Sequence, residues 1–149
     1  MERSTGKQVI VADASVIVKW FVDEEYTKQA LALRQSYING KLDIACPNLL
    51  PYEVLNALRY NPEFGQEQAR TASLALEKYQ LWLHPMQSEL ASLAVKNSFA
   101  FGISLYDSSY VSLAEMLETD FYTADQRMLD KLMVGKSRRI KHVSQFAAD

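Results

Sequence analysis

The stretch Gln8-Val9-Ile10-Val11-Ala12-Asp13 decides the fold of this chain. Its four middle residues are apolar and mostly β-branched, which is typical of a strand buried on both faces of a parallel sheet. Helical sequence follows over 15–22 and 24–38, and Asn39-Gly40 is a signal for a helix end. A buried strand followed by helices predicts an α/β protein with a parallel sheet.

The rest of the chain repeats this alternation of strand and helix. We expect further strands over 42–46, 81–83, 120–124 and 139–143, and further helices from Pro51 to the Asn61-Pro62 break and over 66–80, 88–100, 104–118 and 126–134. This order predicts a three-layer α/β/α sandwich with a central, mostly parallel sheet of four to five strands. The 149 residues suit a single domain, in which we expect residues 1–7 to form a flexible tail.

Composition excludes several classes of protein. No apolar stretch approaches the roughly 20 residues that a membrane span needs. The net charge of −2 gives no overall basic field of the kind that marks many nucleic-acid binders. A lone cysteine, Cys46, excludes an internal disulfide framework, and its apolar neighbours predict a buried packing residue in a reducing cytoplasm. The five glycines do not cluster, so a glycine-rich phosphate loop is also excluded.

Four acids stand where a predicted strand gives way to a helix or in the first turns of a helix: Asp13, Glu53, Asp107 and Asp125. The carboxyl ends of parallel strands share one edge of the sheet, so these side chains are expected to converge in space. Two such charges about 4 Å apart repel by roughly 4 kcal/mol at an effective dielectric near 20. The cluster must therefore be partly protonated or hold a cation.

Two of the acids have a structural alternative when each is taken alone. Asp13 could cap the helix over 15–22. Asp107 stands three residues after Ser104, which matches the spacing of a capping box. Glu53 borders the buried stripe of its helix, where an unpaired glutamate is uncommon. Taken together, the four positions favour a shared site.

The chemistry of the four acids predicts a magnesium site, with Mn²⁺ as a possible substitute. An all-oxygen carboxylate site selects hard cations. Thr123, two residues before Asp125, can supply a hydroxyl that orients a carboxylate. His84 and His142 are isolated, so a histidine-based hydrolase or zinc enzyme is disfavoured. Without a serine or cysteine triad, hydrolysis of a phosphodiester by metal-activated water is the simplest hypothesis.

A basic stretch near the carboxyl end has two interpretations. It contains Lys136, Arg138, Arg139 and Lys141. Such a run can protect an exposed edge strand against aggregation. It can also form a rim that contacts the RNA backbone beside the acidic site.

Four blocks of this sequence resemble the PIN-domain proteins, and especially the VapC-type toxins. They are Val11–Phe21 (VADASVIVKWF), Pro51–Leu58 (PYEVLNAL), Leu105–Ala114 (LYDSSYVSLA) and Phe121–Asp125 (FYTAD). Each block is a weak signal alone, but their order and spacing span nearly the whole chain.

The resemblance implies a metal-dependent endoribonuclease on a small α/β/α sandwich, usually dimeric and inhibited by a small VapB-type antitoxin protein. The four acids match the family's metal-binding positions one for one, and Ser15 and Thr123 match its usual hydroxyl positions. Some relatives carry a further acid two residues after the last aspartate, where this chain has Arg127. A homodimer is also suggested by aromatic residues that crowd the middle of the chain: Tyr52, Tyr60, Phe64, Tyr79 and Trp82.

Three alternatives to a toxin stay open at this point. One is a PIN-domain nuclease of RNA processing outside a toxin system. Another is a PIN-like module that holds RNA or protein without cleaving, which would be expected to lack one or more of the acids. The last is a different magnesium phosphohydrolase of the same layered architecture, which would lack the blocks around Asp107 and Asp125.

Overall fold

The computed structural model describes residues 6–133 and 137–148. Five strands form one sheet in the order β3-β2-β1-β4-β5, and each of its four pairings is parallel. The strands are β1 (Gln8–Ala12), β2 (Leu42–Pro47), β3 (Trp82–His84), β4 (Asp120–Thr123) and β5 (Ile140–His142). Each expected strand is present, so the prediction of a parallel sheet is confirmed.

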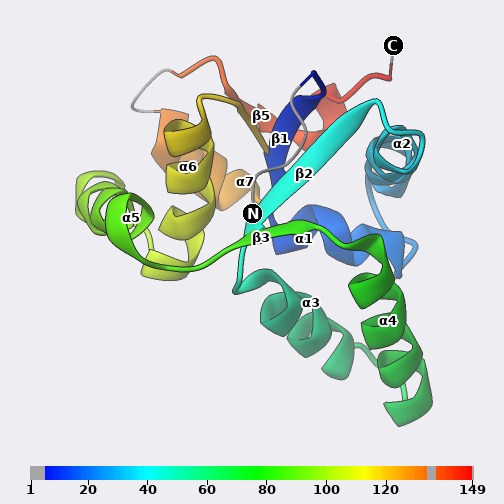
Figure 1. Cartoon of the computed structure of the whole chain (residues 1–149). Coiled ribbons are helices and arrows are strands. Elements are labelled where there is room, and N and C mark those ends of the chain that lie inside the picture. Colours follow the sequence, from blue (N-terminus) through cyan, green and yellow to red (C-terminus); the bar gives the residue numbers. More distant parts are fainter. Residues whose placement is uncertain (1–5, 134–136, 149) are drawn as a thin grey trace.

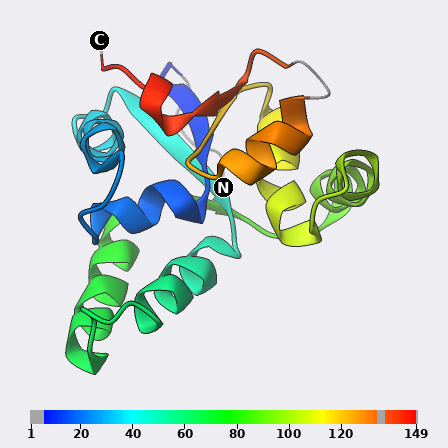
Figure 2. The same ribbon diagram turned by 180° about the vertical axis from the view of Figure 1, so that it is seen from behind.

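The helices form the two outer layers of the sandwich. The longer helices are α2 (Thr27–Ile38), α3 (Leu50–Arg59), α4 (Gln66–Tyr79), α5 (Ser88–Phe101), α6 (Leu105–Leu117) and α7 (Gln126–Leu132), and the short ones are α1 (Ala14–Ile17) and the 3-10 turns η1 (Val18–Trp20) and η3 (Val143–Gln145). Helices α5, α6 and α7 lie on one side of the sheet, and α1 to α4 lie on the other (Figures 1 and 2). The predicted α/β/α sandwich is therefore confirmed.

The segment between β1 and β2 differs from the expected pair of continuous helices. The first helix is only α1 and η1, and the second begins at Thr27 rather than at residue 24. The reason is local: Tyr26 adopts a left-handed backbone with φ of 67°, which a helix cannot contain. The Thr27 hydroxyl accepts a hydrogen bond from the Glu24 backbone N–H and donates one to the carbonyl of Val22, which stabilises the turn.

The centre of the sheet forms the core. Ile10, Val11 and Ala12 of β1 are at most 1% exposed, so the prediction of a strand buried on both faces is confirmed. Cys46 of β2 is fully buried, as predicted, and its thiol donates a hydrogen bond to the Ala12 carbonyl. Burial also raises the pKa of this thiol, which makes it a packing group rather than a nucleophile.

The carboxyl ends of the strands meet at one edge of the sheet, and helices α1 and α7 begin there (Figure 1). Helices α3 and α4 form a pair that extends past the same edge (Figures 1 and 2). In the part of the chain that the structure describes, no helix is long and apolar enough to cross a membrane.

Two of the aromatic residues behind the expectation of a homodimer are strongly exposed. Tyr52 is 77% exposed and Tyr60 is 74% exposed, and both belong to α3 or its end. Phe64, Tyr79 and Trp82 are partly buried against the core. The homodimer stays a prediction.

Candidate metal centre

Asp13 is the most buried acid of the predicted cluster. It follows β1 directly, caps the amino end of α1, and is 6% exposed. Its Oδ1 accepts a hydrogen bond from the Ser15 hydroxyl at 2.5 Å and one from the Val16 backbone N–H at 3.4 Å, while its Oδ2 accepts one from the Thr123 hydroxyl at 2.5 Å. The side chain is therefore held at both oxygens.

Burial is the largest influence on the pKa of Asp13. It raises the pKa of this carboxyl to about 7, although the hydrogen bonds from Ser15 and Thr123 act in the opposite direction. The negative charge of Asp125 raises the pKa further. Without a cation beside it, Asp13 is therefore partly protonated near neutral pH, and burial contributes more to this than repulsion by Asp125 does.

A network of hydroxyls joins the end of β1 to the end of β4. The Ser15 hydroxyl accepts a hydrogen bond from the Ala124 backbone N–H at 2.8 Å, and the Thr123 hydroxyl accepts one from the Asp125 backbone N–H at 3.0 Å. The Ser15 and Thr123 oxygens lie 3.3 Å apart. Both predicted hydroxyls thus orient Asp13 and fix the backbone on which Asp125 stands.

Asp125 is fixed by the helix that it caps. Its Oδ1 accepts hydrogen bonds from the backbone N–H groups of Arg127 and Met128, at 3.0 and 3.2 Å. Asp125 is half-buried where β4 ends and α7 begins. Asp125 therefore caps α7 and also belongs to the acidic cluster.

Asp107 and Glu53 complete the cluster from two other helices. Asp107 lies in the first turn of α6, where its backbone N–H donates to the Ser104 hydroxyl at 3.0 Å. Burial, and then the charge of Asp125, raise the pKa of Asp107. Glu53 lies in the first turn of α3, and burial followed by the charge of Asp107 raises its pKa.

The charges of these acids influence one another: Asp125 raises the pKa of Asp13 and of Asp107, and Asp107 raises that of Glu53. The structure therefore brings all four predicted acids into one region. Within the described ranges, however, no three acid, cysteine or histidine side chains are arranged so that they could hold a metal ion. In this arrangement an ion would be bound by fewer side chains, with water and substrate oxygens as the other ligands. Magnesium is usually bound in this way, and an all-oxygen set of repelling carboxylates fits it.

Comparison with known proteins identifies the family. Residues 10–132, which include all four acids, match the family model for the PIN domain. The chain belongs to the PIN-domain family. It is 31% identical over 127 residues to Ribonuclease VapC3 of Pyrobaculum aerophilum, an alignment that covers 82% of this chain and 93% of the relative.

Solved structures share the fold of this PIN domain. A crystal structure of a Pyrobaculum aerophilum protein superposes with a TM-score of 0.62 and 22% identity, covering 95% of this chain and 93% of the other. A toxin–antitoxin complex from Klebsiella pneumoniae gives a TM-score of 0.65 and 14% identity, covering 90% of this chain and 97% of that chain.

Sequence reasoning missed two residues that act on the cluster of this PIN domain. The Tyr110 hydroxyl donates a hydrogen bond to Glu53 Oε1 at 2.7 Å. Lys131 of α7 lowers the pKa of Asp107 through its positive charge, although the net shift of that carboxyl is upward. A signal for Tyr110 was available, because it stands three residues after Asp107 and so lies on the same face of α6.

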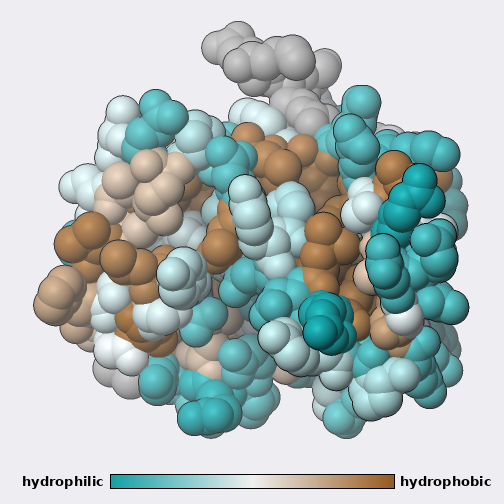
Figure 3. Space-filling view, turned by 90° about the horizontal axis from the view of Figure 1, so that it is seen from below, coloured by the Kyte–Doolittle hydropathy of each residue, from teal (hydrophilic) through white to brown (hydrophobic). Residues whose placement is uncertain are grey.

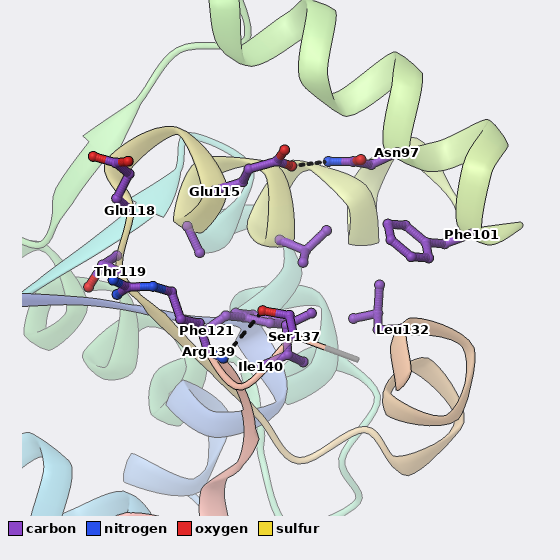
Figure 4. A pocket seen from close by; sticks show the side chains of 12 residues that line it. Asn97, Phe101, Glu115, Glu118, Thr119, Phe121, Leu132, Ser137, Arg139 and Ile140 are labelled. Carbon is purple, nitrogen blue, oxygen red and sulfur yellow. Dashed lines mark hydrogen bonds between the residues drawn. The ribbon is translucent and has the colours of Figure 1, made fainter. Parts of the chain in front are cut away.

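The basic stretch lies mostly away from the acids. Lys136 falls outside the described residues. Arg138 and Arg139 are exposed and precede β5, at the opposite end of the strand from the acidic edge. The Arg139 side chain lines a cleft of about 380 Å³ beside the end of α6, and it extends toward Thr119 (Figure 4).

Lys141 belongs to an ion pair within the sheet. Its Nζ lies 3.0 Å from Asp120 Oδ2, and this hydrogen bond is the main reason that the pKa of Lys141 is raised. The ammonium group also lies over the ring of Tyr122, 5.9 Å from its centre. A phosphate contact at Lys141 would therefore compete with Asp120.

An apolar groove of about 310 Å³ adjoins the acidic edge. Its lining includes Pro47, Met86, Val95, Leu105 and Tyr106, the last of which is next to Asp107 in the chain. Seen from below, the molecule carries hydrophobic areas beside hydrophilic ones on this face (Figure 3). One residue of the groove lining, Tyr106, thus directly precedes an acid of the cluster.

Proposed function

We propose that this PIN domain is a metal-dependent endoribonuclease, which hydrolyses RNA phosphodiester bonds and acts as the toxin of a toxin–antitoxin pair. The observation that carries the proposal is the gathering of Asp13, Glu53, Asp107 and Asp125 at the carboxyl edge of the sheet, with Asp13 buried and held at both oxygens. The substrate class is supported by the 31% identity to a ribonuclease over most of both chains.

The acidic cluster would hold the cation, which we propose to be Mg²⁺, with Mn²⁺ as a substitute; one or two of its carboxylates would bind the ion directly and the others would act through their charge. A divalent cation supplies positive charge that offsets the carboxylates and stabilises negative charge on a phosphate under attack. Ser15 and Thr123 keep Asp13 in one orientation, so little rearrangement is needed when the site fills. Asp125 is kept in place by the backbone N–H groups at the start of α7.

Chelation tests the metal requirement. EDTA should abolish RNA cleavage by the wild-type protein, and Mg²⁺ or Mn²⁺ added in excess should restore it, because the carboxylates repel the RNA backbone until a cation reverses the local charge. Cleavage is measured on a labelled RNA. A preparation of Asp107→Asn made in parallel controls for contaminating nucleases. Cleavage by the wild-type protein that is insensitive to chelation would contradict the metal requirement.

The toxin role brings a protein partner into the proposal. The Klebsiella pneumoniae structure of the same fold is a toxin–antitoxin complex. We propose that this chain likewise binds a small antitoxin protein and that it acts in the cytoplasm. A PIN-domain nuclease of RNA processing is the alternative. Growth arrest on expression, relieved by co-expression of a short protein encoded next to this gene, supports the toxin role. Harmless expression of an active nuclease supports the alternative.

Contacts between the RNA backbone and the exposed arginines before β5 stay a prediction, and an RNA chain would have to run along the β5 edge of the sheet to reach them. Replacement of Arg138 and Arg139 by alanine should weaken binding of all RNA sequences about equally. It should also flatten the dependence of log affinity on log salt by about 0.7 for each lost phosphate contact. Binding is measured by fluorescence anisotropy between about 50 and 200 mM salt. An unchanged slope would assign these arginines to protection of an edge strand.

A further inference from the structure

Tyr110 is a buried aromatic residue that points at the acidic cluster. It lies on α6, one turn after Asp107, and is 1% exposed. It is also the largest of the fully buried side chains among the described residues. A buried tyrosine ring contributes to the core, while its hydroxyl needs a hydrogen-bond partner. The identity of that partner is what gives Tyr110 a role beyond packing.

The partner is one oxygen of Glu53. The Tyr110 hydroxyl donates to Glu53 Oε1 at 2.7 Å, across 57 positions of sequence. This bond joins α6, which carries Asp107, to α3, which carries Glu53. No other described residue has a hydrogen bond to the Glu53 carboxylate, so Oε2 is available for a second ligand.

The hydrogen bond between Tyr110 and Glu53 has a fixed direction. A carboxylate oxygen accepts, so the phenol is the donor and its proton points at Oε1. A single buried donor thus holds this half-buried glutamate in one orientation.

We infer that Tyr110 is a positioning residue that holds Glu53 in the orientation in which it binds the divalent cation. This inference rests on the proposed function, because it assigns Glu53 to the metal site. The geometry favours it over a purely structural role. A tyrosine that served only the core could satisfy its hydroxyl with a backbone carbonyl, as Tyr37 does with those of Tyr79 and Gln80.

The test is the substitution Tyr110→Phe, which removes one oxygen and keeps the ring. Titration of Mn²⁺ into the RNA-free protein by calorimetry should show affinity weakened by about 10- to 100-fold, the usual effect of losing a group that orients a metal ligand. The kcat for RNA cleavage should fall, while KM for RNA changes little. Tyr37→Phe is the matched control, since it also removes one phenol hydroxyl but none that contacts an acid of the cluster.

A double-mutant cycle separates positioning from a general structural role. In the Glu53→Gln background, Tyr110→Phe should weaken Mn²⁺ binding no further, because the carboxylate that it positions is already gone. Equal losses in both backgrounds would overturn the inference, as would wild-type Mn²⁺ affinity in Tyr110→Phe. A Tyr110→Phe protein that does not fold would also overturn it, since the hydroxyl would then serve stability. If wild-type protein itself binds no Mn²⁺, the proposed function fails first.

Discussion

Neutralising any one acid of the cluster should lower the rate of RNA cleavage by more than about 100-fold. The variants are Asp13→Asn, Glu53→Gln, Asp107→Asn and Asp125→Asn. Loss of a group that only orients a metal ligand usually costs about 10- to 100-fold, so removal of a ligand charge should cost more. The measurement is initial cleavage rate on one labelled RNA at saturating Mg²⁺.

A matched control shows whether the position of the acid matters. Glu67 of α4 is exposed and belongs to a weak surface ion pair with Arg70, so Glu67→Gln changes the net charge equally and should cleave RNA like the wild type. Circular dichroism confirms that each variant is folded. Full activity in any two of the four cluster variants would refute the assignment of the site.

The second large effect concerns the stability of the protein without metal. Burial raises the pKa of Asp13 from 3.8 to about 7 in the folded state, while the unfolded chain keeps the lower value. Between these two pH values the folded state binds more protons than the unfolded state. The free energy of unfolding should therefore fall as pH rises from about 4 to about 7, and stay low above that.

The size of this loss follows from the pKa shift. Each unit corresponds to about 1.4 kcal/mol, so a shift of about three units gives about 4 kcal/mol as an upper value. Asp13→Asn removes the ionisable group, so this variant should lose less stability between pH 4 and pH 7. In EDTA, the stability of Asp13→Asn relative to that of the wild type should therefore be higher at pH 8 than at pH 4.

Urea unfolding in EDTA at several pH values measures this effect. Excess Mg²⁺ at pH 8 should raise the stability of the wild type, because a ligand that binds only the folded state stabilises it, and should raise that of Asp13→Asn much less. The control Glu67→Gln should follow the wild type throughout. If the stabilities of the wild type and Asp13→Asn change in parallel with pH, Asp13 does not have a raised pKa in the folded state.

The layout of the sheet could be predicted because its signals are local. The unbroken apolar run of β1 marks a strand buried on both faces, and Asp13 follows it at the strand end where parallel sheets gather their ligands. The acids of α3 and α6 could be predicted because each stands in the first turn of its helix. Their convergence then followed from the topology alone.

What could not be predicted depends on contacts between distant segments or on rare backbone states. The hydrogen bond of Tyr110 to Glu53 joins residues 57 positions apart, and it depends on how α3 and α6 approach each other. The turn before α2 depends on the left-handed backbone of Tyr26, which a tyrosine rarely adopts. The basic residues form one run in the sequence, but Lys141 pairs with Asp120, whereas Arg138 and Arg139 are exposed.

The central claim is that the cluster of four acids at the carboxyl ends of the strands holds the ion used in RNA cleavage. Anomalous X-ray diffraction from a crystal soaked in Mn²⁺ tests it most directly, because the signal locates the ion. We predict an anomalous peak at this edge, within bonding distance of Asp13 and of at least one of the other three acids. The account would be contradicted by the absence of a peak there, at an Mn²⁺ concentration that supports RNA cleavage in solution.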